Sequence, residues 1–245
     1  MNFEIRDYRC RVSGRGLVPF RVVLKESDLQ VLAERDLSRE TLLVLKRQRQ
    51  QLEDYIYRHP SFLGALSPLP LDPRAPTLVQ TMLRAARKAG VGPMAAVAGA
   101  IAERVGRALL SEGLTKEVLV ENGGDIFLAL KREATVGLWA GESPLSGRLG
   151  LKIPAELMPC AVCTSSGTVG HSLSLGKADA LCVIAKEAAL ADALATALGN
   201  LVRGPEDFKR LKKAARRYGE ILGLVCIVAD KLLALGPAVE LVPLS

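Results

Sequence analysis

The chain has 245 residues, of which 49% are hydrophobic and 24% are charged, a balance that supports a sizeable buried core and excludes a disordered polypeptide. The 33 basic and 26 acidic residues give a formal net charge of +7, which favours anionic partners such as phosphorylated small molecules. The longest apolar stretch without a charge, residues 89–102, is too short to span a membrane, and the charged first residues exclude an apolar signal core, so a cytoplasmic location is expected.

The N-terminal part, about residues 1–59, predicts a β-hairpin followed by a charged helix. The hairpin occupies residues 3–25, turns at a Ser-Gly-Arg-Gly sequence, and has 18–25 as its second strand. The helix is expected to begin with Ser38 as its N-cap and to end at His59-Pro60.

Residues 60–76 form a proline-rich crossing segment that is expected to be extended rather than helical. It also contains Phe62 and several leucines, so it is expected to pack on the core instead of serving as a linker between domains.

The remaining core, residues 77–245, predicts an antiparallel sheet with helix pairs, within a single domain covering 1–245. Helices are expected at about 78–90, 94–109, 187–202 and 205–218, and strands at 118–120, 126–130, 136–140, 149–153, 180–185 and in a hairpin over 221–235. Hairpin-length gaps between the strands place the protein in the α+β class, and the two helix pairs suggest a pseudo-duplicated plan.

The first candidate site is the sequence Asn122-Gly123-Gly124-Asp125 after an apolar strand. Two glycines permit positive φ angles and a close approach of the backbone to a ligand, and the flanking side chains offer oxygen atoms and hydrogen bonds. The alternative is an ordinary hairpin turn, because Asn-Gly and Gly-Asp favour such turns.

The second candidate is a Gly/Ser-rich segment over residues 163–180, which can turn backbone N–H groups and hydroxyls toward an anion. Its candidate binding residues are Thr164, Ser165, Ser166, Gly167 and Thr168. It is not a P-loop, because Ala178 follows Lys177 where a Ser or Thr is required. His171 in this segment either binds substrate or simply packs in a turn.

The third candidate is the pair Asp192 and Thr196, four residues apart and therefore on one face of the predicted helix. A carboxylate and a hydroxyl one turn apart can hold a hard cation such as Mg²⁺ if other oxygen atoms complete its shell. The alternative is a carboxylate that stabilises the start of its own helix, with a packed threonine beside it.

Cys160 and Cys163 have CxxC spacing, but the chain has only five cysteines and no second pair to complete a zinc site. Reduced, structural thiols are therefore expected. Late in the chain, a helix at about 205–218 is crowded with lysine and arginine. No aromatic residues alternate with these charges, so a solvated face is expected and nucleic acid is not a favoured partner.

Several segments resemble an uncharacterised protein family of the ApbE superfamily, whose namesakes are FAD:protein FMN transferases, once called thiamine biosynthesis lipoproteins. The resemblance rests on GVGPMAAVAGAIAERVG (90–106), ENGGDIF (121–127), CTSSGTVGHSLSLGKADA (163–180), ADALATALGN (191–200) and HPSF (59–62). It implies a T-fold-like architecture and a flavin ligand, FAD or FMN. It also implies that Asp192 and Thr196 match Mg²⁺ ligands and that His171 matches a site histidine.

The chain departs from the transferases at two places. It has Glu103-Arg104 where they carry a Lys-Gly pair, and His171 is followed by Ser-Leu-Ser-Leu instead of reaching an Asp-Pro pair. The resemblance therefore implies a diverged Mg²⁺-dependent flavin or nucleotidyl transferase, or an FAD pyrophosphatase, acting on a phosphorylated small molecule and a protein target. The alternative is a non-enzymatic accessory protein of anaerobic sulfide assimilation with the same fold. The sequence leaves the oligomeric state open.

Overall fold

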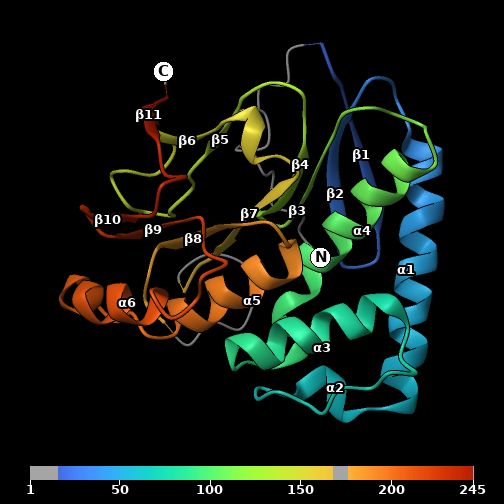
Figure 1. The fold of residues 1–245 in the computed structure, drawn as a ribbon, viewed down its shortest axis with the longest axis horizontal. Helices are drawn as coiled ribbons and strands as arrows, with labels where there is room; N and C mark the ends of the chain where they lie inside the picture. The colour runs from blue at the N-terminus through green and yellow to red at the C-terminus, as the bar shows by residue number, and fades with distance from the viewer. Residues whose placement is uncertain (1–15, 168–175, 245) are drawn as a thin grey trace.

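A computed structural model describes residues 16–167 and 176–244. Its centre is an eight-stranded antiparallel sheet with the order β1-β2-β3-β4-β7-β8-β9-β10. Helices pack on one face of this sheet, and a separate three-stranded sheet, β11-β6-β5, shares a hydrophobic core with the opposite face (Figure 1). The α+β class with antiparallel strands is confirmed, whereas the pseudo-duplicated plan and the single domain over 1–245 stay predictions.

The strands of the large sheet are β1 (Val18–Leu24), β2 (Ser27–Ala33), β3 (Val118–Asn122), β4 (Asp125–Ala129), β7 (Cys160–Ser165), β8 (Ala180–Ala185), β9 (Gly223–Val228) and β10 (Lys231–Leu235). The small sheet contains β5 (Ala134–Gly137), β6 (Leu149–Ile153) and β11 (Leu241–Pro243). The helices are α1 (Ser38–Arg58), α2 (Ser61–Gly64), α3 (Thr77–Ala89), α4 (Val97–Ser111), α5 (Ala188–Gly199) and α6 (Phe208–Ala215), with short 3₁₀ turns at Pro93–Ala96, Ala155–Leu157 and Pro205–Asp207.

The central strands of the large sheet are buried on both faces, because the helices cover one face and the small sheet covers the other, and alternate side chains point to each. In β7, Ala161 and Cys163 belong to the core under the helices, whereas Cys160 and Val162 belong to the core under the small sheet. Its central strands therefore read as continuous apolar runs, as in Ala180–Ala185, where every residue is buried.

The predicted helices α3, α4 and α5 and the hairpin of β9 and β10 are confirmed. Gly90 ends α3 with a φ of 79°, the left-handed conformation that favours glycine at this position. Within the described residues, no helix combines the length and the apolar character needed to cross a membrane.

The N-terminal hairpin differs from the expectation. The predicted strand over 18–25 exists as β1, but its described partner is β2, a strand the sequence did not indicate. The expected partner over residues 3–12 lies outside the described residues. Helix α1 begins at Ser38 instead of being capped by it, since the Ser38 N–H and hydroxyl both donate to Asp36 Oδ1, the former at 2.8 Å.

The proline-rich segment 60–76 is not wholly extended, because α2 forms one helical turn inside it. Phe62 packs in the core as expected, with only 1% of its surface exposed. Leu63, Leu66 and Leu71 instead face solvent.

Candidate functional site

The Gly123-Gly124 pair forms the two-residue turn between β3 and β4. Asn122 and Asp125 are directly paired across the hairpin, and φ is 69° at Gly123 and 102° at Gly124. Positive φ at both central residues is the geometry that matches the twist of a tight hairpin, so the turn alone explains the glycines. Glu121 Oε1 accepts a hydrogen bond from the Gly124 N–H at 2.7 Å and holds the turn in place.

The two residues that flank this turn point their side chains toward the helices. Asn122 Nδ2 donates to the Ala98 carbonyl at 3.1 Å, next to the first turn of α4. Asp125 is only 6% exposed, and its carboxylate accepts hydrogen bonds from the Cys163 thiol and the Thr164 backbone. Asp125 Oδ1 has no hydrogen-bond partner among the described residues. A buried carboxylate oxygen without a partner is costly and therefore indicates a position where a ligand or cation could bind.

Asp192 projects from α5 to the start of α4, where its Oδ2 accepts a hydrogen bond from the Gly99 N–H at 2.9 Å. It does not cap its own helix, since the residue before α5 is Glu187. Burial raises the pKa of Asp192 to about 7, although its hydrogen bonds to the Gly99 and Ala98 backbone act in the opposite direction.

Asp125 and Asp192 are brought close enough to interact electrostatically. Burial raises the pKa of Asp125 well above its ordinary value, and the negative charge of Asp192 is the next largest cause. Two carboxylates in one buried place disfavour each other's ionised form, so such a pair takes up either a proton or a cation. Among the described residues, no group of three or more His, Cys, Asp or Glu side chains could hold a metal ion.

Glycine allows α4 and α5 to approach closely beside this carboxylate pair. A Cβ atom at Gly99 would lie 2.4 Å from the Ala188 carbonyl oxygen and 3.0 Å from Asp192 Cβ, which no real side chain tolerates without movement. Glu103 of α4 in turn accepts a hydrogen bond from the Ala188 N–H at 2.7 Å and pairs with Arg107 at 2.7 Å. The Glu103 position therefore has a structural role in joining the two helices.

The Gly/Ser-rich segment begins as a strand rather than a loop. Thr164 and Ser165 are the last residues of β7, which the sequence had not predicted, and they pair with Cys182 and Leu181 of β8. Ser165 Oγ is buried without a hydrogen-bond partner in the described chain. It lies against α5, since a Cβ at Gly199 would be 3.9 Å from it.

Glycines allow the two described ends of this segment to pack closely against each other and against the end of α5. A Cβ at Gly167 would lie 2.1 Å from the Gly176 carbonyl oxygen, and a Cβ at Gly176 would lie 2.0 Å from the Gly199 carbonyl oxygen. Ser166 lies just before this contact, in the described part of the segment. Thr168 and His171 lie outside the described residues, so their roles stay predictions.

Helix α5 either carries or lies next to the described site residues that the sequence predicted, so that they share one surface. Thr196 lies one turn beyond Asp192 on this helix and is partly buried, as Asp192 is. Asp125 approaches the Asp192 end of α5, and Ser165 approaches the Gly199 end. The structure thus gathers residues from the β3–β4 turn, β7 and α5, while the metal-binding role of Asp192 and Thr196 stays a prediction.

A cavity of about 680 Å³ adjoins this surface, and Asn122 and Ala98 belong to its lining. Its walls are mostly apolar side chains of α1 and α4, including Leu52, Ile56 and Ile101. Ligand pockets commonly have this size and this combination of apolar walls with a few polar groups.

The positively charged side chain of Arg49, on α1, also lines this cavity. It pairs with Glu26 and with Glu53, the latter at 3.0 Å, and donates to Ser27 Oγ at 2.7 Å. Its Nε–H is buried without a partner among the described residues. Sequence reasoning missed Arg49 because it is one of many charges on a solvated helix, and no local motif marks it.

The four described cysteines are free and buried, as the sequence predicted. Cys160 and Cys163 lie in different cores on opposite faces of the sheet, because residues three apart in a strand point in opposite directions. They cannot form a chelating pair in this conformation. Cys163 Sγ lies 3.5 Å from the Ala188 carbonyl oxygen and also beside the Asp125 carboxylate, and its single S–H donates to one of these two acceptors at a time.

Comparison with known proteins shows the family of this chain and agrees with its fold. A profile of the family described as "AbpE bacteria" matches residues 9–220. A "UPF0280 protein" of Methanocaldococcus jannaschii is 38% identical over 228 residues, 91% of this chain and 92% of the relative. A "UPF0280 protein" of Methanocella arvoryzae is 41% identical over 213 residues, 87% of this chain and 86% of the relative.

Two solved structures have a similar fold. The flavin transferase ApbE from Vibrio cholerae is 14% identical, with a TM-score of 0.57 over 93% of this chain and 98% of that chain. The Pseudomonas stutzeri flavinyl transferase ApbE, in its apo form, is 16% identical, with a TM-score of 0.56 over 89% of this chain and 93% of that chain. At these identities the likeness establishes the shared architecture, which is the one expected from the sequence resemblance.

Proposed function

Because this chain belongs to the family described as "AbpE bacteria", we propose that it binds a flavin nucleotide, FAD or FMN, or a related phosphorylated nucleotide. The two solved structures of similar fold are named flavin and flavinyl transferases, which supports this ligand class. In the proposal the ligand lies between the 680 Å³ cavity and the surface of α5. The Asn122–Asp125 turn and residues 164–168 contact its polar part.

The observation that carries the proposal is the interaction of buried Asp125 with partly buried Asp192, together with the Asp125 Oδ1 atom, which has no hydrogen-bond partner among the described residues. These carboxylates, with the Thr196 hydroxyl, fit a small hard cation, because Mg²⁺ is usually held by one or two carboxylates together with phosphate and water. When bound there, Mg²⁺ would offset the charge of the carboxylates and of a ligand phosphate. Because the described residues contain no group of three or more His, Cys, Asp or Glu side chains that could hold a metal ion, ligand phosphate and water would have to complete the shell of a bound cation.

The cavity offers complementary features for the rest of the ligand. Its apolar walls suit a planar ring system, and the unpartnered Arg49 Nε–H suits an oxygen or nitrogen acceptor. The electrostatic attraction of a chain with net charge +7 also favours an anionic ligand.

As part of the same proposal, we assign a role in proton transfer to His171, which the sequence resemblance matches to a site histidine. The reaction class is Mg²⁺-dependent cleavage of the pyrophosphate bond of FAD. With a protein hydroxyl as acceptor, a phosphoester bond to FMN forms, and AMP and the hydroxyl proton are released; with water as acceptor, the products are FMN and AMP. A protein target is required only for the first of these reactions.

The test is a titration of the purified protein with FAD and FMN, followed by flavin fluorescence, with and without Mg²⁺. In the wild type we expect Mg²⁺ to tighten flavin binding at least about tenfold, which is the scale of one charge-assisted contact. Asp125→Asn and Asp192→Asn should each abolish this Mg²⁺-dependent increase in affinity. The matched control Asp230→Asn makes the same change in an exposed turn and should leave binding unchanged.

Chromatography of FAD incubated with the protein and Mg²⁺ then separates the enzymatic from the non-enzymatic alternative. Appearance of FMN and AMP supports cleavage, and flavin bound without turnover supports an accessory role. Absence of binding to FAD, FMN and ATP, with or without Mg²⁺, would overturn the proposal.

A further inference from the structure

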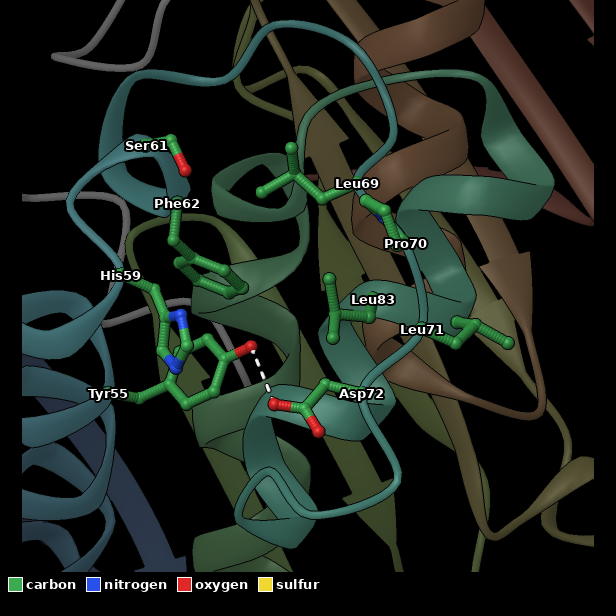
Figure 2. Close-up of a pocket in the computed structure, with 9 residues that line it drawn as sticks. All are labelled: Tyr55, His59, Ser61, Phe62, Leu69, Pro70, Leu71, Asp72 and Leu83. Atoms are coloured by element: carbon green, nitrogen blue, oxygen red, sulfur yellow. Dashed lines mark hydrogen bonds between the residues drawn. The ribbon is translucent and has the colours of Figure 1, made fainter.

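A second cavity, of about 260 Å³, lies at the C-terminal end of α1, and neither Asp125 nor Asp192 belongs to its lining. Figure 2 shows Tyr55, His59 and Phe62 on one side of it, and the segment from Leu69 to Asp72 on the other. His59 and Phe62 belong to the HPSF sequence, which the proposed flavin site does not use.

Aromatic rings form one wall of this cavity. The Tyr55 and His59 ring centroids are 4.3 Å apart with planes tilted by 31°, and Phe62 meets Tyr55 edge-on at 5.3 Å and 80°. Phe62 and Tyr55 are buried, at 1% and 7% exposure, so core packing holds these two rings, whereas His59 is exposed at the end of α1. Leu69 and Leu83 complete an apolar lining.

A single acidic side chain, Asp72, lies among the residues that line the cavity. Asp72 Oδ2 accepts a hydrogen bond from the Tyr55 hydroxyl at 3.1 Å, and Oδ1 accepts one from the Arg74 N–H at 2.9 Å. These bonds hold the pKa of Asp72 below its ordinary value, the Arg74 backbone contributing most, so the group is a carboxylate at neutral pH. Each carboxylate oxygen retains a lone pair for a further donor.

We propose that this cavity binds an organic cation with an apolar stem, an alkylammonium or alkylguanidinium group. The stem contacts Leu69, Leu83 and the ring wall, and the cationic head pairs with Asp72 at the open end. Aromatic rings also attract a cation placed near their faces. The same chemistry is carried by a lysine or arginine side chain of a polypeptide and by a free amine.

Other ligand classes fit less well. An anion would be repelled by the Asp72 carboxylate. A neutral apolar molecule would gain nothing from this carboxylate, which is solvent-accessible and already near the basic side chains of His59 and Arg74, so a cation is the class that gains most from it. The volume of 260 Å³ accommodates a side chain or a small amine rather than a nucleotide. The inference is thus independent of the flavin proposal, and its test uses no flavin.

The test is a titration of the full-length protein with butylammonium and butylguanidinium, followed by saturation-transfer and ¹H–¹⁵N NMR. We expect shifts confined to the residues around Tyr55 and Asp72, and at least about tenfold weaker binding to the neutral analogue 1-butanol. Asp72→Asn, which keeps the shape but removes the charge, should weaken cation binding by a similar factor.

Asp54→Asn is the matched control, because Asp54 precedes Tyr55 on α1 but faces solvent and does not line the cavity. Tyr55→Phe provides a second variant in which the carboxylate remains but loses one hydrogen bond. Equal binding of 1-butanol and butylammonium, or unchanged cation binding in a folded Asp72→Asn protein, would overturn the proposal.

Two peptide probes distinguish the sources of the cation. Binding of acetyl-Gly-Lys-Gly-amide, but not of the norleucine analogue, supports a basic side chain of a polypeptide as the occupant. Binding of butylammonium without binding of the lysine peptide supports a free amine. Failure of all these cations to bind would contradict the inference and leave the flavin proposal untouched.

Discussion

Glu103 and Asp192 cap each other's helices. Glu103 lies on α4 and accepts a hydrogen bond from the Ala188 N–H at the start of α5, at 2.7 Å. Asp192 lies on α5 and accepts one from the Gly99 N–H at the start of α4, at 2.9 Å. Each carboxylate therefore accepts a hydrogen bond from a backbone N–H at the start of the other helix, where such groups have no partner within the helix. Each carboxylate also lies near the positive, N-terminal end of the dipole of that other helix.

Replacement of Glu103 by alanine should destabilise the protein without changing its ligand class. The variant loses the cap on α5 and leaves the Ala188 N–H unsatisfied, which should lower the free energy of unfolding by about 1–2 kcal/mol. Glu103→Gln keeps an acceptor in place and should cost less than half as much. Urea unfolding of the two variants measures this difference, and equal costs would contradict the capping role.

Two different substitutions of Asp192 should separate its role as a cap of α4 from its proposed role in binding Mg²⁺. Asp192→Asn retains an oxygen that can accept from the Gly99 N–H, so we expect little change in melting temperature but loss of Mg²⁺-dependent ligand binding. Asp192→Ala removes the cap as well and should lower the free energy of unfolding by about 1–2 kcal/mol. If both variants lost stability equally and still bound ligand with Mg²⁺, the metal-binding role would be excluded.

Without Mg²⁺, the ionisation of Asp192 should make the protein less stable as the pH rises from about 5 to about 7. The pKa of Asp192 is about 7 in the folded protein against 3.8 as its ordinary value, so the folded state binds more protons in this window. The free energy of unfolding therefore falls with rising pH until the group is ionised. The raised pKa of Asp125 acts in the same direction.

Chemical denaturation at pH 5 and pH 8 measures this slope. The double variant Asp125→Asn/Asp192→Asn should flatten it, and added Mg²⁺ should restore stability more at pH 8 than at pH 5, because protons compete for the same oxygens. A wild-type protein whose stability rises across this window would contradict the prediction.

The contact between α4 and α5 should not tolerate a methyl group at Gly99. Although alanine favours helices, its Cβ would lie 2.4 Å from the Ala188 carbonyl oxygen, so Gly99→Ala should destabilise the fold by about 1–3 kcal/mol. Gly64→Ala is the control, since a Cβ there meets nothing within 4 Å. Thermal melts of both variants suffice, and a stabilised Gly99→Ala protein would show that the helices are less closely packed.

The buried thiols should be inert in the native protein. Burial raises the pKa of Cys160 to about 11 and that of both Cys182 and Cys226 to about 12, so almost no reactive thiolate is present at pH 8. We expect iodoacetamide to label these three sites only after denaturation, as measured by peptide mass spectrometry. Rapid native labelling, or an oxidised Cys160–Cys163 bond, would contradict the arrangement on opposite faces of the sheet.

Local patterns in the sequence were sufficient for much of the fold. The apolar periodicity of α3 and α4 predicts their positions because residues on one helical face repeat about every 3.6 positions. The Gly123-Gly124 pair predicts a tight turn because only glycine adopts positive φ readily at both positions. These signals depend on neighbours in the chain, so no tertiary information is needed to recognise them.

Strand β7 and the pairing of the N-terminal strands were decided by tertiary structure. The residues at the end of β7 include Thr and Ser beside a glycine, which locally favour a loop. Hydrogen bonds to β4 on one side and β8 on the other make this segment a central strand. In the same way, β2 is defined by its partners β1 and β3 more than by its own polar ends.

The candidate site, like the fold, depends partly on local sequence patterns and partly on tertiary packing. The sequence by itself was sufficient to select candidate residues, because Asp125, Asp192 and the Ser/Thr-rich segment stand out from an aliphatic background. Only the tertiary structure decided that the two carboxylates meet and that Arg49 faces the adjoining cavity. Electrostatic coupling depends on distance through space, and that distance is fixed by how α4, α5 and the sheet pack, which no local pattern encodes.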